Sequence, residues 1–409
     1  MENVETLAKK RLEPTWFSEI RENASQLIGK TPYPDFKKLK YKHWDLHLTG
    51  NFIPTESFAS KANVVQAGEN LAQINIPDEY RKKGVIVADF HDALQNYPKL
   101  IKKYFMTKGL KASDDEFLAE HVAYLQSGLF IYVPKNVHVE TPLTCEYLQK
   151  AALGSEYVHH VLLIVDEGSN FSYIEKLTSQ GNEASKVNFV CEVIAKKNSH
   201  VHYTSIDNLA ENVTSYLNRR GYLEKDAKVD WAMALMNDGL TLGDFNSDLV
   251  GDGSHAELKA VGISTNNQVQ GINTRVTNYG NNTIGHILQH GVSLDKSTLI
   301  FNAVGHIMKG SKGSDAEQES RILMLSQGAR GDANPILLID DNDVMAGHAA
   351  SIGRVNPEQL YYLLSRGLDK KMAERVVIRG FLSPVLEEIP TADLKQVFSD
   401  LIERKISEK

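Results

Sequence analysis

His348 stands among side chains too small to bury it, in the stretch MAGHAASIG at 345–353. A neutral imidazole can ligate a metal ion or exchange a proton near neutral pH. A marked helix start follows at Asn356. The residue types alone leave the role of His348 open between a structural side chain and a ligand.

Two further histidines lie four residues apart in HILQH, where His286 and His290 share one face of either a helix or a strand. They could converge on a metal ion or pair with polar neighbours. Together with His306 and His348 they form the ligand set of one alternative, an iron-binding protein. Cys145 and Cys191 lie in strand-like segments and are interpreted as buried thiols. Two thiols cannot supply the four that a permanent iron–sulfur cluster usually needs.

Other catalytic and metal-binding motifs are absent from the sequence. It has no C-x-x-C, H-E-x-x-H or G-x-S-x-G. The nearest approach to a phosphate-binding loop is GHIMKGSKGS, in which Ser311 rather than lysine follows Gly310. The acidic stretch LIDDNDVMAG lacks the distal glutamate of a calcium loop and is interpreted as a turn. The chain is therefore not expected to be an ATPase or a zinc hydrolase.

Composition and charge narrow the function classes further. Hydrophobic residues make up 42% of the chain and charged residues 24%, as in ordinary globular proteins. The net charge is −7 and no basic stripe occurs, which argues against nucleic acid as a partner. No apolar run reaches the length of a membrane span, roughly 18 residues. Charges near the N-terminus, in place of a secretory signal, predict a cytoplasmic location.

The chain divides into three regions with different residue patterns, and these regions must position the side chains described above. Residues 1–115 look mostly helical, with Trp16, Phe17 and Ile20 at helical spacing. Residues 116–355 read as many short strands with no long helix between them, which excludes a doubly wound α/β fold. A sandwich, a barrel and a β-solenoid all remain open, since self-similarity is limited to GHIL at 285–288 and GHIM at 305–308.

Residues 356–409 form the third region, which is predicted to be a small helical domain. Asn356 suits the N-cap of its first helix, Pro357 suits the first helical position, and Gly367 ends that helix. A second helix is predicted through DKKMAERVVIRGFL and a third through TADLKQVFSDLIERKI.

Three segments carry a family resemblance: GLFIYVPKNVHVETPL at 128–143, the long block at 309–368 and GFLSPVLEEIP at 380–390. They closely resemble the SufB/SufD family of iron–sulfur cluster assembly proteins, and its SufD type in particular, and the resemblance covers most of the chain. It implies a mainly β fold: a right-handed parallel β-helix core flanked by N-terminal and C-terminal helical domains. It also implies pairing with a SufB-type paralogue through the β-helix and docking of a SufC-type ATPase on the C-terminal helices.

The resemblance assigns roles to single residues. It places His348 at the family's interface histidine, which would ligate iron in trans with a cysteine of the SufB-type partner. Ser320 and Ala349 stand where SufB-type chains usually have a cysteine and a glutamate, and Ala346 stands where some SufD-type chains have a cysteine. The residues implied to contact the ATPase are Gln359, Leu360, Tyr361, Tyr362, Leu363, Ser365, Arg366 and Gly367.

The leading functional hypothesis is a non-catalytic scaffold subunit of the Suf system. Under this hypothesis the chain alone holds no cofactor stably, an iron–sulfur cluster forms transiently in the complex, and ATP binds to the SufC-type partner. The resemblance leaves open whether the complex binds FADH2. Two alternatives compete with the scaffold: a homodimer of the isolated chain that binds iron through its histidines, and a β-solenoid enzyme acting on polysaccharide.

Overall fold

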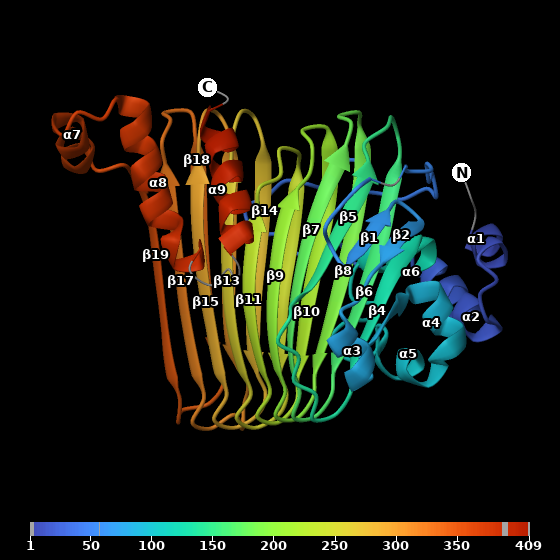
Figure 1. Ribbon diagram of the computed structural model, residues 1–409. Helices are drawn as coiled ribbons and strands as arrows, with labels where there is room; N and C mark the ends of the chain where they lie inside the picture. Colours follow the sequence, from blue (N-terminus) through green and yellow to red (C-terminus); the bar gives the residue numbers. More distant parts are fainter. Residues whose placement is uncertain (1–3, 57, 387–391, 408–409) are drawn as a thin grey trace.

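The protein is described here from a computed structural model that covers residues 4–56, 58–386 and 392–407. Residues 387–391, which include the end of the GFLSPVLEEIP segment, lie outside the described residues. Within the described part, two large sheets face each other to form a parallel β-helix, with helices against their outer surfaces (Figure 1). The predicted parallel β-helix core with flanking helices is confirmed, and the sandwich and barrel alternatives are wrong.

Odd-numbered strands from β5 onwards form one sheet, called sheet A, with an added N-terminal hairpin. Sheet A consists of β1 (Val64–Ala67), β2 (Asn70–Ile74), β5 (Leu143–Lys150), β7 (Asn170–Gln180), β9 (His200–Asn208), β11 (Lys228–Leu235), β13 (His255–Ser264), β15 (Ile284–Ser293), β17 (Asp315–Met324) and β19 (Met345–Arg354).

Even-numbered strands from β4 onwards form the opposite sheet, called sheet B, with β3 at its N-terminal edge. Sheet B consists of β3 (Ile86–Asp89), β4 (Ser127–Val133), β6 (Glu156–Val165), β8 (Ser185–Ala195), β10 (Val213–Leu223), β12 (Thr241–Leu249), β14 (Val269–Asn278), β16 (Thr298–Ile307) and β18 (Arg330–Ile339).

Each coil of the β-helix stacks in register on the coil before it. The number of residues in one coil varies along the chain. Ser127 pairs with His159, and this pair is separated by more residues than the pair Ser215 and Thr241. The coils turn sharply between sheets, and Asn198 adopts a left-handed conformation (φ 55°) in one of these turns. In the stacked position of the preceding coil, Gly168 (φ 69°) leaves no room for a Cβ, which would lie 2.5 Å from a neighbouring Asn oxygen.

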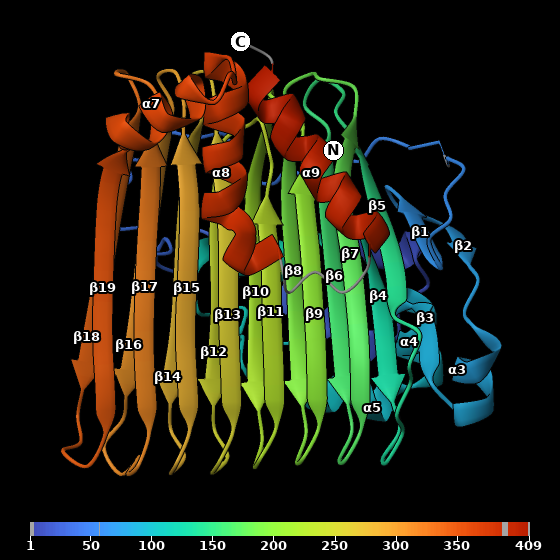
Figure 2. The same cartoon turned by 60° about the vertical axis from the view of Figure 1, so that its left-hand side comes forward.

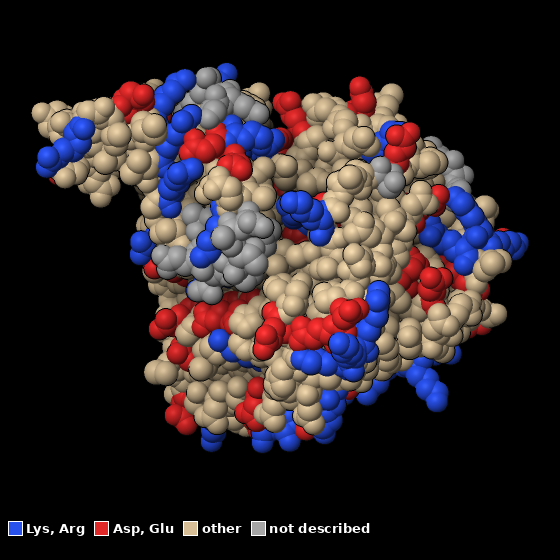
Figure 3. Space-filling model, in the orientation of Figure 1, with Lys and Arg blue, Asp and Glu red and all other residues tan. Residues whose placement is uncertain are grey.

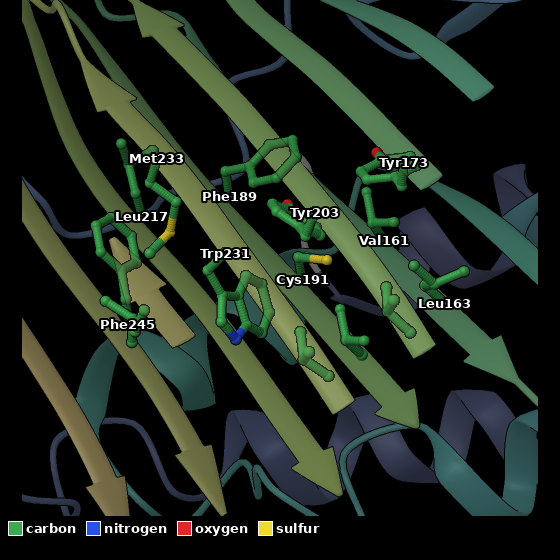
Figure 4. Packing of buried hydrophobic residues seen from close by; sticks show 14 of the residues in the cluster. Val161, Leu163, Tyr173, Phe189, Cys191, Tyr203, Leu217, Trp231, Met233 and Phe245 are labelled. Carbon is green, nitrogen blue, oxygen red and sulfur yellow. The ribbon is translucent and has the colours of Figure 1, made fainter. Parts of the chain in front are cut away.

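Apolar side chains from the inner faces of both sheets fill the interior. Tyr203 and Trp231 of sheet A lie beside Phe189 and Cys191 of sheet B (Figure 4). These residues are almost fully removed from solvent, so each coil buries its inner face against its neighbours. Burial raises the pKa of both thiols, Cys145 and Cys191, as expected for unreactive cysteines.

The N-terminal helices pack on the outer face of sheet B. Their apolar residues form one cluster with outward-facing residues of β6, β8, β10 and β12. These helices are α1 (Val4–Lys10), α2 (Thr15–Ser25), α4 (Phe90–Asn96), α5 (Pro98–Tyr104) and α6 (Glu116–Tyr124). Helix α3 (Asp78–Lys83) instead contributes Tyr80 to the cluster that fills the interior. The predicted helix around Trp16 and Phe17 is confirmed as α2. The first 115 residues also supply β1, β2 and β3, which cover the first coil of the β-helix.

The C-terminal helices are α7 (Pro357–Ser365), α8 (Lys370–Leu386) and α9 (Ala392–Ser407). They confirm the three helices predicted after Asn356, the third from Ala392 onwards. Ile378 and Leu382 of α8 and Phe398 and Ile402 of α9 are fully buried in a cluster with residues of sheet A. Helices α8 and α9 cross one half of the outer face of sheet A (Figure 2). Helix α7 stands away from the body (Figure 1). Among the described residues, no helix has both the length and the apolar composition required to cross a bilayer.

Candidate functional site at the open end of the β-helix

The two ends of the β-helix differ in what covers them. At the first coil, β1 and β2 extend sheet A and β3 extends sheet B. At the other end β18 and β19 are edge strands, and within the described ranges no later strand pairs with either. Four large apolar side chains are exposed there: Leu338 (41%), Ile339 (46%), Met345 (65%) and Ile352 (42%). Such an edge is a template for pairing with another chain.

His348 lies in the middle of β19 and is exposed. It pairs in register with Gln318 of β17, which is buried and faces the interior, so the His348 ring points in the same inward direction on the last coil. Small residues surround it, and a Cβ added at Gly347 would meet nothing within 4 Å. The register therefore displays the imidazole at the open end without covering it.

Ser320, where the family resemblance expects a thiol in SufB-type chains, lies one coil further inside. It is fully buried, and its hydroxyl donates to Oε1 of Gln289 at 2.7 Å. Because Ser320 pairs with Ala350 rather than with His348, the two positions are offset along the strands. Neither described cysteine lies on these last strands, so this end offers an imidazole and no thiol.

Helix α7 begins beside the open end and carries the residues expected to contact an ATPase. The side chain of Asn356 accepts a hydrogen bond from the Glu358 amide at 2.8 Å and caps the helix. None of its residues is buried, and Tyr361 is 73% exposed. The Arg366 guanidinium lies 5.0 Å from the centre of the Tyr362 ring.

A surface hollow of 730 Å³ separates α7 from α8 and the end of β17. It is lined by Leu323, Arg354, Val355, Asn356, Glu358, Gln359, Tyr362, Leu363, Val376, Val377, Gly380 and Phe381. Both an exposed aromatic helix and an adjoining hollow are therefore present next to β19. Aromatic and arginine side chains are enriched in protein interfaces.

His290 holds α8 against sheet A. Its Nδ1 lies 2.8 Å from the carbonyl oxygen of Phe381, and its ring stacks on the Phe381 ring with centroids 4.8 Å apart. Its Nε2 lies 3.2 Å from Oε1 of Glu319. Both ring nitrogens thus have protein partners, and the side chain connects the helix to the strand.

The four histidines considered as metal contacts do not come together. His306 lies on the outer face of sheet B, with Nε2 3.0 Å from Oδ2 of Asp340. His286 and His290 share the outer face of sheet A, as the spacing predicts, but His286 pairs with Glu257 at 3.0 Å. His348 lies on β19 and points to the interior, on the opposite face of sheet A from His286 and His290.

Two histidine–carboxylate clusters on the outer face of sheet A were not found from the sequence. One contains His200, His202 and Asp230, and the other contains His255, Glu257 and His286. Their signals are the alternating pairs H-x-H at 200–202 and H-x-E at 255–257, which put both side chains on one face of a strand.

In the cluster of His255, Glu257 and His286, contacts between the ionisable groups shift the pKa of Glu257 and of His286. Burial opposes ionisation of Glu257, but hydrogen bonds from His255 and His286 outweigh it and hold the pKa of that carboxyl well below its usual range. The hydrogen bond to Glu257 raises the pKa of His286 against the effect of burial. The carboxylate is therefore ionised throughout the physiological range.

Comparisons with known proteins agree with this architecture. The model of the SufBD core domain, described as SUF system FeS cluster assembly, matches residues 147–381, and the SufBD N-terminal region matches residues 59–145. The chain is 39% identical to the iron–sulfur cluster assembly protein SufD of Bacillus subtilis, over 99% of this chain and 97% of that protein. It is 28% identical to an iron–sulfur cluster assembly SufBD family protein of Staphylococcus epidermidis, over 95% of this chain and 89% of that protein.

A SufBD family protein of Staphylococcus aureus is also 28% identical over the same shares of the two chains. The core model covers more than half of the 409 residues, and the Bacillus subtilis relative aligns along nearly the whole chain. The chain belongs to the SufBD family of SUF-system iron–sulfur cluster assembly proteins.

Proposed function

We propose that this chain is a non-catalytic scaffold subunit of a cytoplasmic iron–sulfur cluster assembly complex. In this proposal it pairs with a SufB-type chain through the open end of the β-helix, and a SufC-type ATPase docks on its C-terminal helices. ATP is bound by that ATPase, the cluster is assembled transiently, and the isolated chain retains neither.

The observation that carries the proposal is the uncovered last coil. The four exposed apolar side chains of β18 and β19 amount to about two fully exposed residues. Burying that surface would contribute roughly 3–6 kcal/mol, at about 1.5–3 kcal/mol for each fully buried side chain. A second chain that stacks on β18 and β19 would bury it and pair the free backbone groups of both edges.

His348 is the metal-ligating side chain that such pairing would bring to the interface. Both cysteines of this chain are buried in the β-helix, so a thiolate ligand would have to come from the partner. An imidazole from one chain and a thiolate from the other suit iron. The small residues around His348 leave space for the partner's backbone to approach.

Helix α7 supports the docking part of the proposal. Its aromatic residues are exposed and contribute nothing to the buried core, so their presence is explained better by a partner than by folding. The hollow beside it adds an apolar depression into which a partner side chain would fit. Docking at α7 would lie directly next to β19, so motion of the ATPase would reach the pairing surface.

The test is to co-express the chain with SufB-type and SufC-type proteins and to isolate the assembly. We expect all three proteins to co-purify, Tyr361→Ala with Tyr362→Ala to remove the ATPase, and Ile352→Asp to remove the SufB-type chain. Because these residues are exposed, the variants should fold normally. Retention of the ATPase by the tyrosine variant would refute docking at α7.

The role of His348 is tested inside the intact complex. We expect His348→Ala to preserve assembly of the three proteins but to reduce cluster formation, measured by visible absorption and by iron and sulfide content. His306→Ala, on the outer face of sheet B, is the matched control and should retain cluster formation. Full cluster formation by the His348 variant would show that the imidazole is not a ligand.

A further inference from the structure

A row of histidines and carboxylates runs across four strands on the outer face of sheet A. The in-register residues are His202 on β9, Asp230 on β11, Glu257 on β13 and His286 on β15. All four lie at the third position of their strands. Helices α8 and α9 cover the other half of this face, near the ends of the strands (Figure 2). The four side chains of the row are partly exposed, from 20% for Asp230 to 42% for His202.

The surface below these helices is strongly charged, with a band of acidic side chains beside lysine or arginine side chains (Figure 3). A hollow of 330 Å³ lies over the β9–β13 part of the row and is lined by His202, Asp230 and Glu257 among others. His255, Glu257 and His286 are each partly exposed, so a small ion can reach these three side chains from solvent.

Three side chains at the β13–β15 part of the row converge on one point. Oε1 of Glu257 lies 2.7 Å from Nε2 of His255 and 3.0 Å from Nδ1 of His286. The centroids of the His255 and His286 rings are 6.1 Å apart, and the ring planes are inclined at 77° to each other. One ligand atom from each of the three residues lies within 4.8 Å of the others.

The second nitrogen of His286 is also engaged. Its Nε2 lies 3.5 Å from Oδ2 of Asp315, the first residue of β17. The other oxygen of Asp315, Oδ1, is buried without a hydrogen-bond partner. A carboxylate behind a ligating imidazole fixes the ring and its tautomer in protein metal sites.

The two other clusters are less suited to an ion. Nζ of Lys228 lies 3.2 Å from Oδ1 of Asp230, so the cluster with His200 and His202 already has a cation beside its carboxylate. A third cluster, away from sheet A, contains His47, Glu116 and Glu120. In it Glu116 accepts hydrogen bonds from the Gly29 amide and the Thr31 hydroxyl. These bonds hold the Glu116 carboxylate in the fold.

We propose that His255, Glu257 and His286 bind one divalent transition-metal ion, with Asp315 as the residue that positions His286. Two imidazoles and one carboxylate form the donor set that suits ferrous iron and zinc. The choice of ferrous iron as the ion in the cell rests on the proposed function in cluster assembly, whereas the site itself does not. Solvent would supply the remaining ligands, so the ion would be exchangeable.

The observed spacing is close to that of a filled site. Around an ion with bonds of about 2.1 Å, neighbouring ligand atoms lie about 3.0–3.4 Å apart. The Glu257 oxygen is 2.7 Å and 3.0 Å from the two ring nitrogens, so these two pairs need to separate by only a few tenths of an ångström. The two ring nitrogens lie within 4.8 Å of each other, so rotation of the two imidazoles toward the ion supplies the rest. In-register pairing of β13 with β15 holds the two strands in place, so the backbone is pre-arranged.

The experiment titrates the purified full chain with Co²⁺ under anaerobic conditions, followed by visible absorption, and then displaces Co²⁺ with Fe²⁺. We expect one strong site per chain. Glu257→Gln should weaken it at least tenfold and change the absorption bands. Asp315→Asn should weaken it roughly 10–100-fold but leave the bands in place, because it removes a positioning residue and not a ligand.

Three matched variants should leave the strong site unchanged. His306→Gln removes a histidine that pairs with a carboxylate on the other sheet, Asp230→Asn disables the neighbouring cluster, and His348→Ala removes the histidine of the open end. Wild-type affinity in Glu257→Gln, or loss of the site in any of these three, would overturn the proposal. If Glu257→Gln does not fold, His286→Gln carries the same comparison, because that side chain is 30% exposed.

This titration needs no partner protein and no cluster assembly. Failure here would leave the pairing and docking experiments untouched, and failure of those would leave this result standing.

Discussion

A buried ion triad in the centre of the β-helix offers a sharp test of how the core is held together. The guanidinium of Arg219 donates to Oε1 of Glu175 at 2.8 and 2.9 Å and to Oδ1 of Asp207 at 2.6 Å. All three side chains are fully buried, and the guanidinium also lies over the rings of Phe189 and Phe245. The triad joins strands of both sheets across the interior.

We expect Arg219→Met to reduce the free energy of unfolding by about 3–5 kcal/mol at pH 7, because two buried carboxylates lose the cation that they share. Desolvation already raises the pKa of Glu175 and of Asp207 above the ordinary values, and the arginine opposes it. Without the arginine both pKa values rise further, so the folded variant retains protons that the unfolded chain releases.

The sign of the pH dependence follows from this difference. When the folded state binds more protons, stability falls as pH rises, by about 1.4 kcal/mol per pH unit for each such group. The Arg219→Met variant should therefore be much closer to the wild type at pH 5 than at pH 7. Replacing the carboxylates as well, by Glu175→Gln with Asp207→Asn, should restore much of the loss and remove its pH dependence.

Urea unfolding at both pH values, followed by the fluorescence of the buried Trp231, measures these differences. Hydrogen exchange of β7, β9 and β10 localises them to the coils that carry the triad. A loss below about 1 kcal/mol, well under the range for a broken buried pair, or an equal loss at pH 5 and pH 7, would refute the account of the triad as mutually compensating charges.

Two further variants test the surfaces on which the helices pack. The carboxyl of Glu192 accepts a hydrogen bond from the Met106 amide and faces His160, and burial raises its pKa to about 8. At pH 8 the unfolded chain releases this proton more readily than the folded state does, which destabilises the fold. Glu192→Gln should therefore raise Tm more at pH 8 than at pH 5. Equal gains at both pH values would contradict that origin. His290→Gln should lose the stacking on Phe381 and speed hydrogen exchange in α8 at least several-fold, whereas unchanged exchange would show that His290 does not anchor the helix.

The strand pattern predicted the β region, but only the family resemblance predicted its architecture. Short strands separated by Gly, Asn and Asp excluded long crossover helices, and the structure has none between β4 and β19 among the described residues. A sandwich and a β-helix share that pattern, and the coil length here changes along the chain, as the pairs Ser215–Thr241 and Ser127–His159 show. Stacking fixes the register locally, so no constant repeat is needed.

The same variation explains why the histidine–carboxylate row could not be predicted. The members of the row, His202, Asp230, Glu257 and His286, are unequally spaced in the sequence, and the in-register column two residues earlier holds His200, Lys228, His255 and Ile284. The residue types along the column follow no repeat, so internal similarity does not reveal it. Helix α7, by contrast, was predictable because its start depends on local chemistry, a capping Asn356 followed by Pro357.

A solenoid distributes its stability over contacts between adjacent coils, which makes the terminal coils special. In this chain the first coil is covered by β1, β2 and β3, which the chain supplies itself. The last coil instead presents an exposed imidazole, small residues and apolar side chains. Since a solenoid that stays alone needs a cap with a polar outer face at both ends, the asymmetry itself favours a partner at the His348 end.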